Sequence, residues 1–309
     1  MTDIDDLRWA DNYPGQEPCL GEIFCLTFIR GVDEREALHR MGGLPGTVAT
    51  RTASELEAET NFDNGYPEVA AALPLGTWTV VFEPRGFSGN SMTPVLSRGT
   101  EAVSVLRHDY ASPGFAYSVD GELVTYFDPT FPTDRDGADP DRLLTSMHDV
   151  GFTMGEDDDN FDHDTARSLL LTERLTSVLP TFEALTGPLL SAHFEPWFTD
   201  TPRQPAGRPG HDGPVDAITE VRRLTGLLGL TGTPGLAEAL AAAERGEKVT
   251  VTPESPLGQH VRGWLAESRR AGQSLNDHSG RMTEKERRRR AFDHGWLARA
   301  LGAALQQVR

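Results

Sequence analysis

The chain has 309 residues, of which 38% are hydrophobic, and its formal net charge is −18. This length and apolar content suffice for two globular domains and exclude wholesale disorder. The longest apolar stretch near the start, residues 23–29, has only seven residues, whereas a membrane span needs roughly 20. We therefore expect no membrane segment.

The composition also indicates where the protein works. Acidic residues rather than a basic region precede the first apolar stretch, which is not typical of a signal peptide. Cys19 and Cys25 are the only cysteines, too few for a secreted disulfide framework and without the pairing of a zinc site. These features favour a cytoplasmic protein in which Cys25 is a buried free thiol. The 27 Arg and 2 Lys indicate a GC-rich genome and favour an actinobacterial source.

The first expected elements are a short helix, a strand and a capped helix. Residues 1–13 predict a short polar helix. The run from Ile23 to Gly31 predicts a buried strand, because it is short and rich in β-branched and aromatic residues. Asp33 and Glu36 form the capping-box pattern that begins the next helix, and a glycine pair ends it.

The middle of the chain predicts mainly strands. Ser54 is the expected cap of a further short helix. The elements expected after it are a strand over 76–86, a short helix over 91–99, a strand over 101–109 and a hairpin over 114–129. The hairpin turns at Asp120-Gly121, a strong short-range signal for two antiparallel strands.

Helices are expected after the hairpin. Asp139 caps the first, with Pro140 at its first position, the second begins at Asp162 or Asp164, and residues 181–198 complete the region. The last three strands lie too close together for crossover helices, so the sheet must be antiparallel or mixed. The sequence therefore predicts an α+β domain over residues 1–198 with its helices packed on one face.

A second, all-α module follows a linker. Residues 199–214 hold four Pro and three Gly in sixteen positions, which indicates an exposed linker. Residues 215–309 predict helices that begin near 215, 234 and 255, and a last helix opened by Thr283 and Glu286. The expected apolar face of the last helix comprises Phe292, Trp296, Leu297, Leu301, Leu305 and Val308.

Four blocks of the first domain carry a family resemblance. They read CLTFIRGVDEREALHRMGG, GTWTVVFEPRGFSG, GTEAVSVLRHDYASPGFAYSVDGELVTYFDP and LTERLTSVLPTFEALTGPLL, in that order. Together they resemble an uncharacterised family of actinobacterial domains of unknown function. The resemblance covers residues 4–198 and implies a shared fold and host group, but no activity and no site residues.

The C-terminal module is similar to the DNA-binding end of the Lsr-type nucleoid proteins. Those proteins show an Arg-x-Trp-Ala helix, a loop with Arg-Gly-Arg and a second helix. Arg262, Trp264, Gly280 and Arg281 fall in that order here. Ser279 replaces the first loop arginine, a leucine separates the tryptophan from the alanine, and the connection is longer. The resemblance implies a DNA contact through this module.

Charge is distributed unevenly along the chain. Residues 1–214 hold 36 acidic residues and 14 Arg, whereas residues 215–309 hold 15 basic and 11 acidic residues. An acidic body repels phosphate backbones, so only residues 215–309 suit nucleic acid. The candidate contacts are Arg281, Arg287, Arg288, Arg289 and Arg290. The alternative is that this basic run is a solvated helix face.

No sequence motif assigns a catalytic, metal or cofactor site. The chain has no nucleophile elbow, P-loop or His-Glu-x-x-His pattern. The acidic run over 156–164 departs from a calcium loop, because His163 and Leu169 stand where Gly and Glu are required. We therefore expect no metal and no cofactor.

Charged residues at two strand ends are the candidates for a ligand or partner site. Glu83 and Arg85 end the clearest strand beside flexible glycines, and Arg107 lies near the end of the neighbouring strand. Such residues can line a cleft, although surface ion pairs at turns are common and weak. In an enzyme, His108 would be the base beside these three residues.

The absence of catalytic motifs favours a non-enzymatic interaction or regulatory protein. Its expected partner is an unidentified protein, and a basic one would complement the acidic domain. The alternatives are DNA binding through residues 215–309 and an enzyme with its site at the strand ends.

Overall fold

The computed structural model describes residues 2–11, 18–155, 160–203 and 215–306. The chain divides into unit 1, Met1–Ala58 with Glu68–Thr199, and unit 2, Glu59–Pro67 with Asp200–Arg309. This division differs from the predicted linear order in one segment, because residues 59–67 group with the C-terminal helices. Most of the predicted linker, residues 204–214, lies outside the described residues.

Unit 1 is built on a nine-stranded sheet in which every pair of neighbouring strands is antiparallel. The order of the strands is β2-β9-β3-β4-β1-β5-β6-β7-β8. Their bounds are β1 Ile23–Arg30, β2 Ala49–Arg51, β3 Glu68–Leu75, β4 Trp78–Pro84, β5 Glu101–His108, β6 Gly114–Val119, β7 Glu122–Phe127, β8 Arg135–Asp136 and β9 Leu189–Phe194. The predicted α+β class is confirmed.

One predicted helical region contains a strand instead. Residues 181–198 form a short helix, the strand β9 and a 3-10 turn. Gly187 and Pro188 follow the short helix and prevent its continuation. The six residues of β9 then pair with β2 and β3. A short apolar run of this length does not distinguish a strand from a helix by its periodicity.

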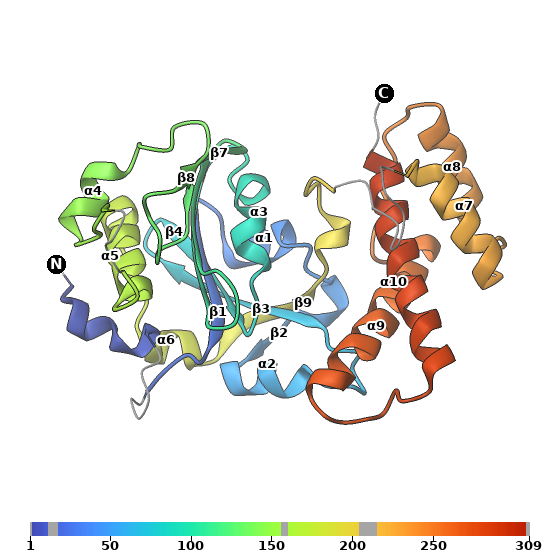
Figure 1. The fold of residues 1–309 in the computed structure, drawn as a ribbon, viewed down its shortest axis with the longest axis horizontal. Coiled ribbons are helices and arrows are strands. Elements are labelled where there is room, and N and C mark those ends of the chain that lie inside the picture. Colours follow the sequence, from blue (N-terminus) through green and yellow to red (C-terminus); the bar gives the residue numbers. More distant parts are fainter. Residues whose placement is uncertain (1, 12–17, 156–159, 204–214, 307–309) are drawn as a thin grey trace. The chain divides into compact units, whose positions relative to one another are not determined.

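Helices cover both faces of the sheet, whereas one covered face was expected. Figure 1 shows α4 and α5 on one side and α1 and α3 on the other. The reason lies in β1, whose residues Phe24–Ile29 are all buried, so that both of its faces need cover. The helical bounds are η1 Ile4–Ala10, α1 Glu34–Arg40, η2 Pro45–Thr47, α2 Ala53–Glu59, α3 Ser88–Leu96, α4 Leu144–Asp149, α5 Asp164–Thr176, α6 Phe182–Thr186 and η3 Pro196–Phe198.

Capping residues set where several helices begin. Asp33 accepts a hydrogen bond from the Glu36 amide (2.8 Å), as its position in the sequence predicts. The helix expected at Asp139 begins later, at Leu144, because the backbone of Asp139 bonds to Val124 and to the Thr125 hydroxyl.

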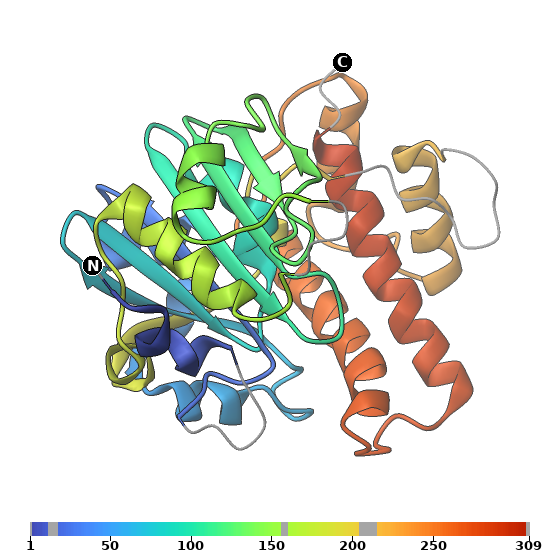
Figure 2. The same cartoon turned by 60° about the vertical axis from the view of Figure 1, so that its left-hand side comes forward.

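Figure 2 shows α5 lying across one face of the sheet, and η1 packs against α5.

Unit 2 contains four helices among its described residues: α7 Ala217–Leu228, α8 Leu236–Glu244, α9 Pro256–Asn276 and α10 Lys285–Gln306. The helix α10 packs against the other three. Leu297, Leu301 and Leu305 are buried as predicted, but Phe292 is 44% exposed. Small residues occupy the packed face, where Ala291, Gly295 and Ala298 are buried. Trp296 is half-buried, and Val308 lies outside the described residues.

The segment Glu59–Pro67 packs against α9 and α10. Phe62 contacts the buried side chains of Ala271, Met282 and Ala291. Arg270 donates a hydrogen bond from Nε to the Phe62 carbonyl oxygen (2.9 Å). Side chains from two distant parts of the chain therefore build unit 2. No helix in the described part of the chain is long and apolar enough to cross a lipid bilayer.

Candidate functional site

A pocket of about 530 Å³ lies in unit 1, at the end of the sheet where β5 and β7 finish and β6 begins. We call it the rim pocket. Its lining comprises Asp11, residues 107–113 at the end of β5 and in the turn to β6, Asp128, Thr130 and Phe131 after β7, Phe161 before α5, and Asp164 at the start of α5. Antiparallel pairing brings these loops to one end of the sheet.

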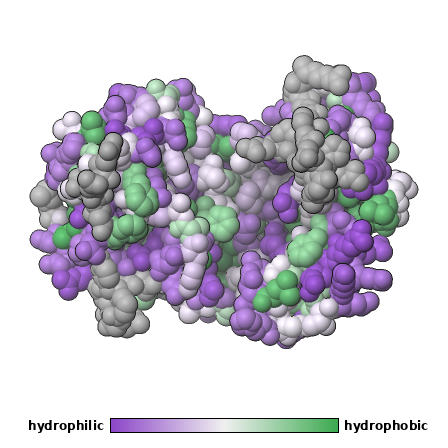
Figure 3. Space-filling model, viewed as in Figure 1, coloured by the Kyte–Doolittle hydropathy of each residue, from purple (hydrophilic) through white to green (hydrophobic). Residues whose placement is uncertain are grey.

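Exposed aromatic side chains surround this pocket. Tyr110, Phe131 and Phe161 line it and are 71%, 56% and 59% exposed. Phe87 is 58% exposed, and its ring lies 6.1 Å from that of His108, which also lines the pocket. These four are the only large hydrophobic side chains exposed among the described residues of unit 1. Figure 3 shows mainly hydrophilic residues, with separate hydrophobic patches, on the face in view.

Arg107 is the cation of the pocket and is held firmly. Its Nη1 donates to the Ala10 carbonyl oxygen (3.2 Å) and to the Thr165 hydroxyl (3.3 Å). Its Nη2 lies 2.8 Å from an Asp109 oxygen. Its Nε is buried and has no hydrogen-bond partner among the described residues. The charge of this guanidinium is compensated by Asp109 while one donor remains unused.

Asp11 and Asp164 line the rim pocket together with its aromatic rim, the exposed rings of Tyr110, Phe131 and Phe161. Burial raises the pKa of both Asp11 and Asp164 above the ordinary value of an aspartate. Asp11 accepts hydrogen bonds from the Ala166 amide (3.1 Å) at the start of α5 and lies 3.1 Å from His163 Nδ1. These contacts show that Asp11 anchors α5 from a segment more than 150 residues earlier. They suit a structural and electrostatic role rather than nucleophilic chemistry.

The three residues predicted at the strand ends do not converge. Glu83 of β4 lies opposite Cys25 of β1, and Cys25 lies opposite Leu106 of β5. These three residues form one row across the sheet. Arg107 lies opposite Phe24 and so belongs to the adjacent row. Adjacent rows point to opposite faces of a sheet, so Glu83 and Arg107 lie on opposite faces. Only Arg107 and His108 line the rim pocket, and Arg85 is exposed in the turn after β4.

Glu83 instead caps a helix inside the protein. Its carboxyl group accepts hydrogen bonds from the amides of Ser88 (3.0 Å) and Gly89 (2.7 Å), at the start of α3. Burial raises the pKa of Glu83 to about 8. Its neighbours include Cys25, whose thiol is buried and free as expected.

The basic run of unit 2 is divided among different surroundings. Arg281 pairs with Asp63 (2.5 Å) and lies over the Phe62 ring. Arg287 and Arg290 line a separate cavity in unit 2, whereas Arg288 and Arg289 do not line it. Successive helical residues point about 100° apart, so four consecutive arginines cannot share one face. The role of these residues in nucleic-acid binding stays a prediction.

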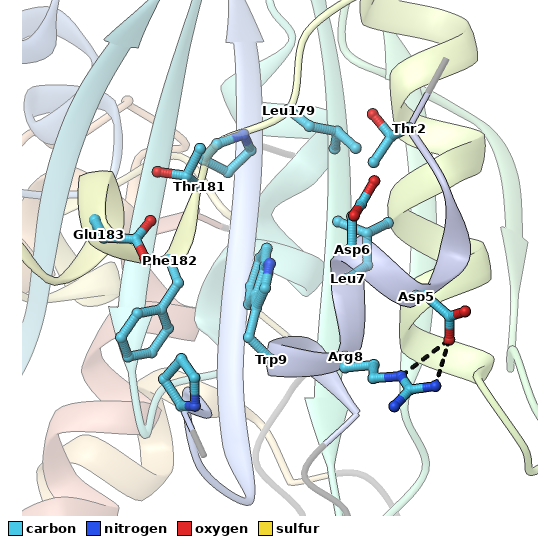
Figure 4. Close-up of a pocket in the computed structure, with 12 residues that line it drawn as sticks. Thr2, Asp5, Asp6, Leu7, Arg8, Trp9, Leu179, Thr181, Phe182 and Glu183 are labelled. Carbon is cyan, nitrogen blue, oxygen red and sulfur yellow. Dashed lines mark hydrogen bonds and ion pairs between the residues drawn. The ribbon is translucent and has the colours of Figure 1, made fainter. Parts of the chain in front are cut away.

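A second pocket of unit 1, beside η1 and α6, is less suited to a ligand. Figure 4 shows Trp9 and Phe182 among its walls, with Arg8 bonded to Asp5. Asp6 accepts a hydrogen bond from the Asp3 amide within a capping box. Arg8, Asp5 and Asp6 are therefore already engaged in local contacts.

Sequence reasoning found Arg107 and His108 and missed the aromatic rim. Tyr110, Phe131 and Phe161 lie in turns rich in Asp and Pro, and an aromatic residue in such a polar turn is the signal that could have found them. Among the described residues, no cluster of His, Cys, Asp and Glu could hold a metal ion.

Comparison with known proteins identifies the first domain only. The sequence profile of a family of unknown function (DUF6461) matches residues 1–195. No curated protein and no solved structure matches the chain. The actinobacterial origin and the Lsr-like similarity of the C-terminal module stay predictions. Because the match covers more than half of the chain and nearly all of unit 1, the chain belongs to the family of unknown function DUF6461.

Proposed function

We propose that this protein is a non-enzymatic interaction protein whose first domain binds a basic segment of a partner protein in the rim pocket. The gathering of the exposed aromatic side chains of unit 1 around one pocket carries the proposal. Contiguous exposed apolar surface is uncommon on monomeric proteins and marks interaction sites. Aromatic residues are also the commonest anchors of protein interfaces.

Charge supports a basic partner. The lining of the rim pocket holds four carboxyl groups, those of Asp11, Asp109, Asp128 and Asp164, against the single Arg107. Asp109 compensates Arg107 and Asp11 is buried, so a Lys or Arg of the partner would meet the half-buried Asp128 and Asp164 together with aromatic ring faces, which attract cations. The large acidic excess of residues 1–214 would steer such a partner toward this domain.

The geometry gives less support to the enzyme alternative. A site at the strand ends requires Glu83, Arg85, Arg107 and His108 in one cleft, and Glu83 lies buried on the other face of the sheet. We retain the cytoplasm as the proposed location, since Cys19 and Cys25 are free thiols.

The test compares partner binding by three forms of the full-length protein. The first is the wild type, the second carries Tyr110→Ser and Phe131→Ser, and the third carries the control Phe292→Ser on unit 2. Proteins captured from a host lysate are identified, and a basic peptide from a captured protein is titrated by fluorescence anisotropy.

We expect the double variant to weaken peptide binding about tenfold or more, the usual effect of losing interface anchors. The Phe292→Ser control should bind like the wild type, because Phe292 is similarly exposed but lies far along the chain in unit 2. Equal binding by all three forms would contradict the proposal. If the wild type turned over a substrate and the double variant did not, the enzyme alternative would be favoured.

A further inference from the structure

Unit 2 contains a cavity of about 570 Å³ that the proposed function does not use. We call it the arginine cavity. Segment 59–67, α9, α10 and the loop between these helices form its walls. Its charged lining comprises Asp63, Glu267, Arg270, Arg287, Arg290 and His294.

Both acidic side chains of the cavity already have side-chain partners. Asp63 lies 2.5 Å from Nη1 of Arg281, which is outside the lining. Glu267 lies 2.5 Å from Nδ1 of His294. Because Arg281 compensates Asp63, three arginines stand against the one carboxylate of Glu267, which gives the cavity an excess of positive charge.

Two of these arginines are held in place by the backbone. Arg270 donates from Nε to the Phe62 carbonyl oxygen (2.9 Å) and from Nη2 to that of Asp63 (3.1 Å). Arg290 donates from Nη2 to the Leu228 carbonyl oxygen (3.2 Å). A carbonyl oxygen orients a guanidinium without neutralising it, so less conformational entropy is lost when an anion binds.

The first half of α10 favours an anion for two further reasons. Four consecutive arginines follow Lys285 and Glu286 in its first turns, where like charges repel and the helix dipole opposes cations. In addition, the His294 side chain is only 9% exposed, and its buried Nε2 has no hydrogen-bond partner among the described residues. An anion in the cavity would reduce the repulsion among the arginines, and a protonated Nε2 would gain a hydrogen-bond acceptor.

We propose that the arginine cavity binds the phosphate group of a small phosphorylated molecule through Arg270, Arg287 and Arg290. A phosphomonoester dianion offers three terminal oxygens to three guanidinium groups, whereas a carboxylate offers two oxygens and one charge. A concave site also suits a compact terminal phosphate better than the outer surface of a duplex. The site lies in unit 2, so this proposal does not depend on the proposed function of the rim pocket.

The test uses full-length protein and isothermal titration with inorganic phosphate and pyrophosphate at constant ionic strength. Arg287→Ser and Arg290→Ser each remove a cavity arginine. Arg289→Ser is the matched control, because it removes the same charge from the same run of arginines without changing the cavity lining. Circular-dichroism melting of each variant confirms that it is folded.

We expect saturable binding of both anions by the wild type. Each cavity variant should weaken it by about tenfold, in line with the loss of a charge-assisted hydrogen bond, and Arg289→Ser should change it by less than about twofold. Acetate at the same ionic strength should not compete.

Absence of saturable binding, competition by acetate or equal weakening by all three variants would each overturn the proposal. A duplex DNA titration separates the alternative ligand. If DNA binds more tightly than pyrophosphate and Arg289→Ser weakens it as much as Arg287→Ser does, the whole basic run is a nucleic-acid face and the cavity is not the site.

Discussion

Glu83 shows how one buried side chain makes the stability of this protein depend on pH. It is fully buried, and it accepts two amide hydrogen bonds at the start of α3. Burial raises its pKa from 4.5 to about 8, and the nearby Glu68 acts in the same direction. The native state therefore keeps a proton on Glu83 that the unfolded chain releases near pH 4.5.

This raised pKa gives a prediction for Glu83→Gln. From pH 4.5 to 8 the wild type should lose stability as the unfolded chain ionises and the native protein does not. Glutamine stays neutral, so the unfolding free energy of the variant relative to the wild type should rise over this range and then level off. At pH 5 or below the variant should be less stable by about 1–3 kcal/mol, because its amide can accept only one of the two hydrogen bonds.

Urea unfolding of both proteins at pH 5, 6, 7 and 8 measures this difference. Contributions from other groups with raised pKa values, such as Asp11 and Asp164, are present in both proteins and cancel. A difference that stays constant with pH would show that the native carboxyl ionises in its ordinary range.

The helices α9 and α10 pack closely because small residues face each other. A Cβ atom on Gly295 would lie 2.2 Å from Oγ and 2.5 Å from Cβ of Ser268. In contrast, a Cβ atom on Gly263 in α9 would meet nothing within 4 Å. The two glycines therefore have different roles in this pair of helices.

Alanine substitutions at these two positions should have opposite effects. Gly295→Ala should lower the unfolding free energy by about 1–3 kcal/mol, because α9 and α10 must move apart to relieve the overlap. Gly263→Ala should raise it by about 0.5–1 kcal/mol, since alanine has the higher helix propensity. Thermal and urea unfolding measure both. Destabilisation by Gly263→Ala, or tolerance of Gly295→Ala, would contradict the packing described.

The two units are not consecutive pieces of the chain, because the segment Glu59–Pro67 belongs to unit 2 but lies between two parts of unit 1 in sequence. Phe62 lies between α2 and β3 in sequence but packs on α9 and α10. The Tyr66 hydroxyl donates a hydrogen bond to the Asp277 carboxylate at the end of α9. A chain of residues 215–309 alone would lack these contacts, so the C-terminal module is incomplete as a linear piece.

Phe62→Ala should therefore lower the stability of unit 2, although residue 62 lies between two elements of unit 1, α2 and β3. We expect a loss of about 1–2 kcal/mol of local stability, because a half-buried ring is removed. Hydrogen exchange should become faster in α9 and α10 and stay unchanged in β1, β4 and β5. The control Phe131→Ala, at an exposed ring of unit 1, should leave α9 and α10 unchanged. Faster exchange confined to unit 1 would contradict this assignment of Phe62.

The sequence alone determined the elements whose signals are local. The apolar run of β1, the Asp120-Gly121 turn and the Asp33 cap each depend on residues close in the chain, and all three were predicted. The helices of unit 2 were predicted from equally local signals, since apolar residues at helical spacing mark α7 and α10 and the Ser255 cap begins α9.

The tertiary structure decided which residues meet. Residues 189–194 form the strand β9 because they pair with β2 and β3. Phe292 is exposed because the small residues of α10 occupy its packed face. Glu83 and Arg107 were separated by one step of register, which places adjacent positions on opposite faces of a sheet. The rim pocket and the arginine cavity each combine side chains from segments far apart in sequence. Long-range register and packing place such side chains together, and no pattern among neighbouring residues records them.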